Sequence, residues 1–146
     1  MLIIGCGNRQ RGDDAAGILV AEKLSALGVE ALLCSGDAAE LMAAWGASND
    51  VIVVDAVLTG ASLGAVHVWD GRHPPLSAPA AASTHGLGVG EAIALAQAMD
   101  RLPSRLRIYG IEGKNFDVGG QLSPEVLQAI ELVVERIITE VKAATR

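Results

Sequence analysis

The sequence predicts one α/β domain over residues 1–146, a three-layer α/β/α sandwich around a mostly parallel sheet. Short apolar runs that are typical of strands alternate with longer segments in which apolar residues recur at helical spacing. One run, 51–55, is apolar up to its final aspartate, as expected for a strand buried on both faces of a parallel sheet. With 51% apolar residues, the chain can bury one hydrophobic core of its own.

The first half of the chain predicts three strands and two helices in alternation. Residues 1–6 form the first strand, and the apolar residues of 13–27 are three and four positions apart, as on one face of a helix. A second strand is predicted at 29–34, a short helix at about 38–45 and the third strand at 51–55. This alternation favours a parallel arrangement of the strands.

The fourth predicted strand, 65–69, differs from the others because no helix precedes it. Only a short loop with Gly60 and Gly64 separates it from the third strand, and such a loop cannot contain a crossover helix. The fourth strand should therefore run antiparallel to its neighbour. The proline-containing segment 72–82 that follows is predicted to be a surface loop, long enough for a flap over a site.

The C-terminal part predicts a third helix at 88–101, a fifth strand at 106–112 and a long final helix. Ser123 and Pro124 stand at favourable N-cap and first-turn positions for that last helix. Its apolar residues form one stripe, which is typical of a helix packed on a core. The stripe consists of Val126, Leu127, Ile130, Val133, Val134, Ile137, Ile138 and Val141.

Composition and charge argue against several functional classes. The net charge of −6, with 17 acidic and 11 scattered basic residues, disfavours nucleic acid and anionic lipid as partners. No transmembrane span or signal peptide is predicted. Cys6 and Cys34 lack the spacing of a metal site or of a disulfide framework. We therefore expect a cytoplasmic protein with reduced, buried thiols and no membrane partner.

Three polar residues lie where open α/β sheets bind their ligands, beyond the carboxyl ends of the strands. Asp14 lies at the junction between the first strand and helix, Asp55 ends the third strand, and His85 directly precedes the third helix. Two carboxylates and one imidazole from separate loops suit a divalent transition metal, with room for a substrate group. Structural roles are the alternatives, a turn cap for Asp55 and an ordinary structural histidine for His85.

The glycine-containing segment 5–8 raises a different alternative, a dinucleotide-binding turn. Gln10 stands where the third glycine of that turn is expected, and Asp13 and Asp14 stand where a pyrophosphate would bind. These features disfavour a nucleotide cofactor. For Asp13 we favour a helix-capping role that complements the helix dipole. Asp14 then remains as a second carboxylate that needs a cation or a donor.

Several short motifs, in this order and spacing, resemble those of the hydrogenase maturation endopeptidases nearly from end to end. The motifs are Gly5-Cys6-Gly7-Asn8, Gly12-Asp13-Asp14 with Gly17, Val53-Val54-Asp55-Ala56, Ser83-Thr84-His85-Gly86-Leu87, Tyr109-Gly110-Ile111-Glu112-Gly113 and Leu122-Ser123-Pro124. The resemblance implies a five-stranded, mostly parallel twisted sheet with one antiparallel strand. It also implies that Asp14, Asp55 and His85 match the family's three nickel-contacting positions. The turn 35–38 departs from the family's Gly-Gly-Thr-like pattern, and its Asp37 is a further candidate without an assigned role.

The function that this resemblance implies is that of an endopeptidase. Such an enzyme removes a C-terminal extension from the precursor of the nickel-iron hydrogenase large subunit after nickel insertion, so the nickel belongs to the substrate and no tightly bound cofactor is expected. Our hypothesis is that Asp14, Asp55 and His85 engage this nickel, which polarises the scissile carbonyl or activates water. One of the acids acting as general base is an alternative. Two other classes remain, a non-catalytic nickel or hydrogenase-assembly chaperone and a small nucleotide-binding module.

Overall fold

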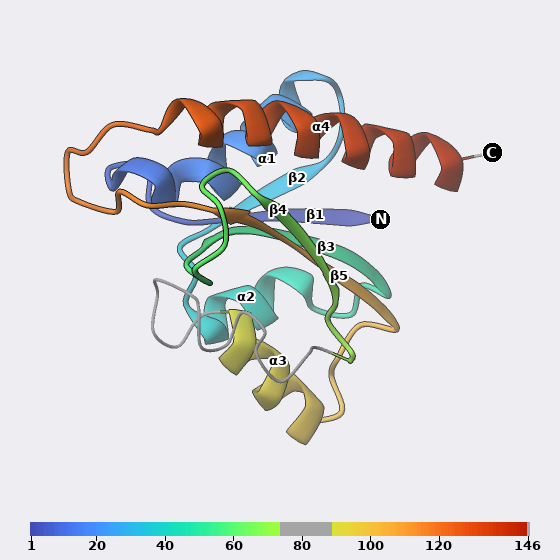
Figure 1. Ribbon diagram of the computed structural model, residues 1–146. Coiled ribbons are helices and arrows are strands. Elements are labelled where there is room, and N and C mark those ends of the chain that lie inside the picture. Colours follow the sequence, from blue (N-terminus) through green and yellow to red (C-terminus); the bar gives the residue numbers. More distant parts are fainter. Residues whose placement is uncertain (74–88, 146) are drawn as a thin grey trace.

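A computed structural model describes residues 1–73 and 89–145 of the protein (Figure 1). Within these residues a five-stranded sheet lies between two layers of helices, which confirms the predicted sandwich. The strands are β1 (Leu2–Cys6), β2 (Ala31–Cys34), β3 (Asp50–Val57), β4 (Val66–Asp70) and β5 (Arg105–Glu112). The helices are the 3-10 turn η1 (Gly12–Ala15) and α1 (Ala16–Ala26), α2 (Ala38–Trp45), α3 (Val89–Ala98) and α4 (Pro124–Ala144).

Four strands of the sheet are parallel and one is antiparallel. The order is β2-β1-β3-β5-β4, and β4 pairs with β5 in the antiparallel direction. The antiparallel direction of the fourth strand is thus confirmed. The strand beside β4 is β5, which lies between β3 and β4 in the sheet although it follows both in the sequence. The short loop from β3 to β4 therefore crosses the end of β5.

Each face of the sheet is covered by two helices. Figure 1 shows α1 and α4 on one face and α2 and α3 on the other. Because side chains alternate along a strand, Val54 belongs to the core under α1 and α4, whereas Val53 belongs to the core under α2 and α3. This alternation decides which face of the sheet each polar residue of β3 and β5 can reach.

The strand β3 is longer than its sequence suggests. It continues to Val57, so Asp55 lies inside the strand. Our prediction that Asp55 ends the strand was therefore wrong. The reason is the partner strand, because β5 continues through Glu112 and pairs with Val57. The apolar residues Ala56 and Val57 are fully covered there, which makes the extension favourable.

Asp37, the candidate in the turn that departs from the family pattern, is the N-cap residue of α2. The carboxylate of Asp37 accepts a hydrogen bond from the backbone N–H of Glu40 at 3.0 Å, which is the usual N-cap contact. Asp37 therefore has a capping role. None of the helices in the described part of the chain is long and apolar enough to cross a membrane.

Candidate active site

Asp14 lies in η1, the short turn after β1, and is fully buried. Its backbone holds the preceding loop, because the N–H of Asn8 donates to the carbonyl oxygen of Asp14 at 3.2 Å. Gly7 has a φ of 148°, and a Cβ atom there would lie 2.0 Å from the same oxygen. The close approach of the two segments therefore requires glycine at position 7.

Asp55 is 1% exposed and lies beside Gly110 in the β3–β5 pair. Its Oδ1 atom accepts the N–H of Ala56 at 2.9 Å. Side chains two positions apart in a strand point to the same face, so Asp55 shares the orientation of Val53 toward the α2/α3 side. The turn-capping alternative does not describe this position, because Asp55 is paired within the sheet.

The structure brings Asp14 and Asp55 to the same end of the sheet, the one toward which the carboxyl ends of the parallel strands point. Gly17, in the first turn of α1, lies close to the strands that precede Asp14 and contain Asp55. A Cβ atom at Gly17 would lie 2.3 Å from the carbonyl oxygens of both Cys6 and Val54. The start of α1 therefore packs directly on the carboxyl-terminal parts of β1 and β3, and η1 contacts β3. Two buried carboxylates lie at the edge where the sequence placed the site.

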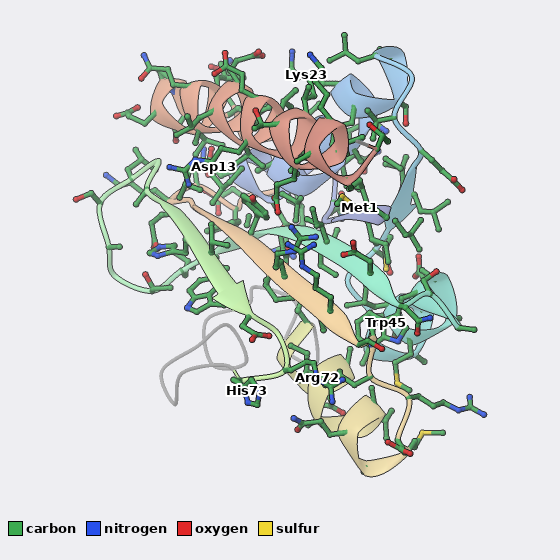
Figure 2. The ribbon with its side chains drawn as sticks, turned by 90° about the vertical axis from the view of Figure 1, so that its right-hand side faces the viewer. Met1, Asp13, Lys23, Trp45, Arg72 and His73 are labelled. Carbon is green, nitrogen blue, oxygen red and sulfur yellow. The ribbon has the colours of Figure 1, made fainter. Side chains whose placement is uncertain are left out.

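His85, the third predicted site residue, lies outside the described residues, as does most of the predicted loop 72–82. Figure 2 labels His73, the last described residue before this gap. Among residues 1–73 and 89–145, no group of three or more His, Cys, Asp or Glu side chains is arranged to hold a metal ion. The proposed three-residue set therefore remains a prediction.

Asp13 lies in the first turn of η1, but it does not form the helix-capping hydrogen bond that we favoured for it, and that part of the prediction was wrong. Its carboxylate makes no capping hydrogen bond to its own helix, and instead accepts four from the segment between β5 and α4. Oδ2 accepts the N–H groups of Lys114 at 2.9 Å and Asn115 at 3.0 Å and the hydroxyl of Ser123 at 2.9 Å, while Oδ1 accepts the N–H of Ser123 at 2.7 Å. Figure 2 shows Asp13 between α4 and the sheet. We call this set of contacts the Asp13 clamp.

The Asp13 clamp stabilises the ionised carboxylate. Burial is the largest single influence and would raise the pKa, but the hydrogen bonds from Ser123, Asn115 and Lys114 together outweigh it. The pKa of Asp13 is therefore lowered from its ordinary value. The clamp holds the turn that carries Asp14 against the start of α4.

Glu112 is a buried acid that the sequence interpretation included only as part of a motif. It is 2% exposed at the end of β5, and its carboxylate accepts the N–H of Thr59 at 2.8 Å and the Thr59 hydroxyl at 2.5 Å. The Nε2 atom of His67 lies 3.1 Å from Glu112 Oε1, and the His67 ring stacks on Trp69 at 5.0 Å between centroids. Like Asp55, Glu112 is an acid in an apolar strand, and this was the signal available in the sequence. It anchors the loop after β3 on the same face of the sheet as Asp55.

Comparison with known proteins decides the family of this chain. The model of the hydrogenase maturation protease family (HycI) matches residues 35–140, which is more than half of the chain. The chain belongs to the hydrogenase maturation protease family. It is accordingly a protease, and the resemblance read from its motifs is confirmed.

Relatives of this protease support the assignment over nearly the whole chain. The hydrogenase expression/formation protein HupD of Rhodobacter capsulatus is 29% identical over 150 residues, which cover 98% of this chain and 71% of HupD. The [NiFe] hydrogenase maturation protease HybD of Thermococcus kodakarensis has a similar structure, with a TM-score of 0.76, 25% identity and coverage of 94% of this chain and 96% of HybD. The hydrogenase maturating endopeptidase HybD of E. coli, with a TM-score of 0.77, 20% identity and coverage of 98% and 92%, shares the fold.

A cavity of about 410 Å³ lies beside the Asp14 turn of the protease. It is formed where the loop after β1 meets the loop after β2, and it has both apolar and charged walls. Its lining residues are Gly7, Asn8, Arg9, Arg11, Ile18, Leu33, Cys34, Ser35 and Glu40. The cavity therefore adjoins the edge of the sheet that carries the two buried aspartates.

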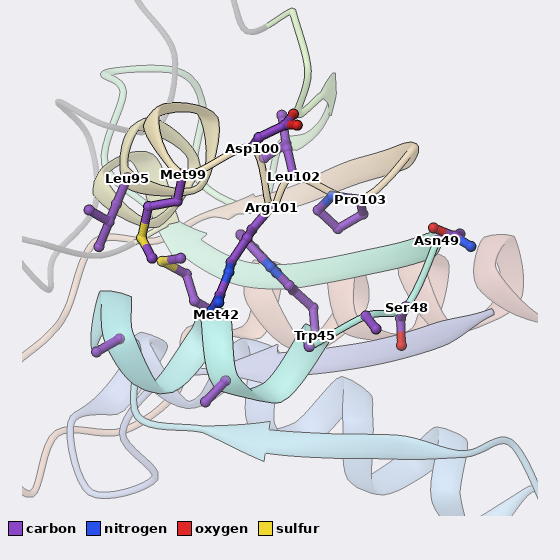
Figure 3. Close-up of a pocket in the computed structure, with 14 residues that line it drawn as sticks. Met42, Trp45, Ser48, Asn49, Leu95, Met99, Asp100, Arg101, Leu102 and Pro103 are labelled. Carbon is purple, nitrogen blue, oxygen red and sulfur yellow. The ribbon is translucent and has the colours of Figure 1, made fainter.

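A larger cavity, of about 730 Å³, lies between α2 and α3 at the opposite edge of the sheet (Figure 3). Met42, Leu95 and Met99 lie between the two helices, and the loops that enter β3 and β5 complete the wall. These loops precede the parallel strands, whereas Asp14 and Asp55 lie toward the strands' carboxyl ends. The larger cavity is thus remote from the candidate site.

Proposed function

We propose that this protease removes the C-terminal extension of a nickel-iron hydrogenase large-subunit precursor after nickel insertion, and that Asp14, Asp55 and His85 contact the nickel of that precursor. The observation that carries the proposal is the pair of buried aspartates, Asp14 and Asp55, at one edge of the sheet in a chain of this family. We further propose that the reaction takes place in the cytoplasm.

The chemistry of the two aspartates suits a metal-bearing substrate. Buried carboxylates attract a divalent cation strongly, because the surrounding dielectric constant is lower than that of water. Imidazole is a ligand that suits nickel, and carboxylates are ligands of divalent cations. The protease then recognises a precursor by the metal that it already carries.

The support for His85 as the third residue comes from the segment that follows it in the sequence. The segment with His85 joins α3 at Val89, and Val89 is buried in the α2/α3 core. Asp55 points to this same side of the sheet. We propose that the imidazole of His85, which precedes Val89 by four positions in the sequence, completes a set of ligands from three parts of the chain.

In the hydrolytic step, the nickel of the substrate would polarise the scissile carbonyl or lower the pKa of a water molecule. The protein's contribution is to hold the metal and the peptide bond together, so that water attacks a correctly placed carbon. One of the two aspartates can accept the proton of the attacking water. Replacement of either carboxylate by an amide tests these roles with little change in side-chain size.

The test is processing of a large-subunit precursor, nickel-loaded or nickel-free, followed by intact mass. We expect wild type and the control Asp117→Asn, an exposed acid outside the site, to shorten only the loaded precursor. Asp14→Asn, Asp55→Asn and His85→Gln should lower the rate by on the order of 10²-fold or more. Equal cleavage of the nickel-loaded and the nickel-free precursor would contradict the proposed role of nickel in recognition and hydrolysis. A stable complex without any cleavage would indicate an assembly chaperone.

A further inference from the structure

The two cysteines of the chain, Cys6 and Cys34, are direct neighbours in the sheet. They are the last residues of β1 and β2 and are partners in the parallel register. Adjacent strands are about 4.8 Å apart, and a disulfide requires a Cα separation of about 4.4–6.8 Å. Both side chains belong to the core under α2 and α3, so they point to the same face of the sheet. The strand spacing therefore falls within the Cα range of a disulfide. The Cβ atoms of such side-by-side residues lie about as far apart as the strands, slightly beyond the roughly 3.5–4.5 Å of a disulfide. Bond formation therefore requires the two strand ends to approach each other, and both cysteines are free thiols in the structure.

The two thiols differ in their surroundings in a way that favours stepwise oxidation. Cys34 is 3% exposed and lines the cavity beside the Asp14 turn, whereas Cys6 is 0% exposed. The hydrogen bond from the Cys6 thiol, assisted by the N–H of Gly36, lowers the pKa of Cys34 against the opposing effects of burial and of Glu40. Because Cys34 lines the cavity and Cys6 does not, a small peroxide that enters the cavity meets Cys34 first, and Cys6 is the resolving thiol.

We propose that Cys6 and Cys34 form an oxidant-sensitive dithiol that a hydroperoxide converts to a disulfide, and that this conversion slows the protease. The Cys34 thiolate attacks a peroxide oxygen, so that an S–O bond forms, the O–O bond breaks and the leaving oxygen departs as water or an alcohol after taking a proton. The Cys6 sulfur then attacks the Cys34 sulfur, so that an S–S bond forms and the S–O bond breaks, and the leaving hydroxide takes the proton of the Cys6 thiol and departs as water. The two thiols lose two electrons, which reduce the peroxide.

The dithiol is coupled to the Asp14 turn through the backbone. The carbonyl oxygen of Cys34 accepts the N–H of Gly7 at 3.0 Å, and Gly7 packs against the carbonyl oxygen of Asp14. Disulfide formation shortens the sulfur separation to about 2.0 Å, which draws the ends of β1 and β2 together. A displacement of about 1 Å in a catalytic group lowers a rate by on the order of 10²-fold. This regulatory part rests on the proposed function of Asp14.

The first test uses the full-length protein, hydrogen peroxide and mass spectrometry. After alkylation of free thiols, digestion with trypsin should give peptide 1–9 linked to peptide 24–72, because these contain the chain's two cysteines. Dithiothreitol should release the linked peptides. Sulfinic or sulfonic acid on Cys34 with Cys6 still alkylatable, or a disulfide between two chains, would overturn the proposal.

The second test compares precursor cleavage by the oxidised and the reduced form of each variant. Wild type should lose about tenfold or more of its rate on oxidation and regain it with dithiothreitol. Cys6→Ala should show no such disulfide and should accumulate a sulfenic acid on Cys34 that a dimedone reagent traps. Equal rates for the oxidised and reduced wild type would overturn the regulatory part. If the reduced protein cleaves nothing, the proposed function and the regulation fail together, while the linked peptides still decide whether the dithiol forms.

Discussion

The Asp13 clamp allows a quantitative prediction for the substitution Asp13→Ala. The carboxylate accepts four hydrogen bonds, and each bond to a charged group contributes about 1.5–3 kcal/mol. Water can replace the acceptor for Lys114, which is exposed, and partly for Asn115. The two bonds from Ser123 are harder to replace, so we expect a loss of about 4 kcal/mol in the free energy of unfolding. This is a large fraction of the roughly 5–15 kcal/mol of a typical domain.

Asp13→Asn should cost less, about 2 kcal/mol. Its carbonyl oxygen can keep the three bonds of Oδ2, but its amide group then faces the N–H of Ser123. Urea unfolding followed by tryptophan fluorescence measures both values, since Trp45 is 1% exposed in the folded state. Asp117→Asn, an exposed acid of the same segment, is the control and should change stability by less than about 0.5 kcal/mol. A loss below about 1 kcal/mol for Asp13→Ala, or an equal loss for the control, would refute the clamp.

The same clamp predicts a pH dependence with a definite sign. The pKa of Asp13 is lower in the folded than in the unfolded protein, so its contribution is complete above the unfolded value and disappears as the pH falls through the folded value. The stability difference between wild type and Asp13→Asn should therefore narrow as the pH drops below about 4. A difference that stays constant or widens on acidification would contradict this assignment.

Three further predictions concern other parts of the fold. Gly17→Ala should destabilise by about 3 kcal/mol and reduce soluble yield, because its Cβ would lie 2.3 Å from two carbonyl oxygens. Arg107→Ala should lower the free energy of unfolding in urea by about 3 kcal/mol, because the largely buried guanidinium contacts Asp50 at 2.9 Å and also Glu140. The control is Arg105→Ala, which removes an exposed guanidinium near Asp50 and should lower it by less than about 1 kcal/mol. Glu112→Ala should cost about 2 kcal/mol and increase proteolysis in the loop after β3, since Thr59 loses both hydrogen bonds; equal digestion of both proteins would count against that anchor.

Much of the fold could be predicted from the sequence because the local residue patterns that indicate helices and strands match the elements that the sheet and its helices contain. The helix predicted at 38–45 has those limits in the structure, where Asp37 caps its start. The antiparallel direction of β4 followed from the length of one loop. The limit of β3 could not be predicted in this way, because it depends on how far β5 continues beside it.

The location of the candidate residues was predictable where it depends on a place after or near the end of a strand. Asp14 and Asp55 lie at one edge of the sheet for this reason. Asp13 shows the limit, because it is adjacent to Asp14 and of the same type, yet its role depends on Ser123, 110 positions along the chain. No local pattern contains such a partner. Glu112 was recognisable as an acid in an apolar strand, but its contacts with Thr59 and His67 depend on how two loops meet.

The distance along the chain between Asp13 and Ser123 has a consequence for biosynthesis. A ribosome produces Asp13 long before Ser123, which lies 110 positions further along the chain. Contacts between distant parts of a chain form late and slowly. The turn with Asp14 therefore gains the contacts of the Asp13 clamp only after Ser123 has left the ribosome. A nascent chain that has not yet exposed Ser123 lacks the contacts that hold the Asp14 turn against the start of α4.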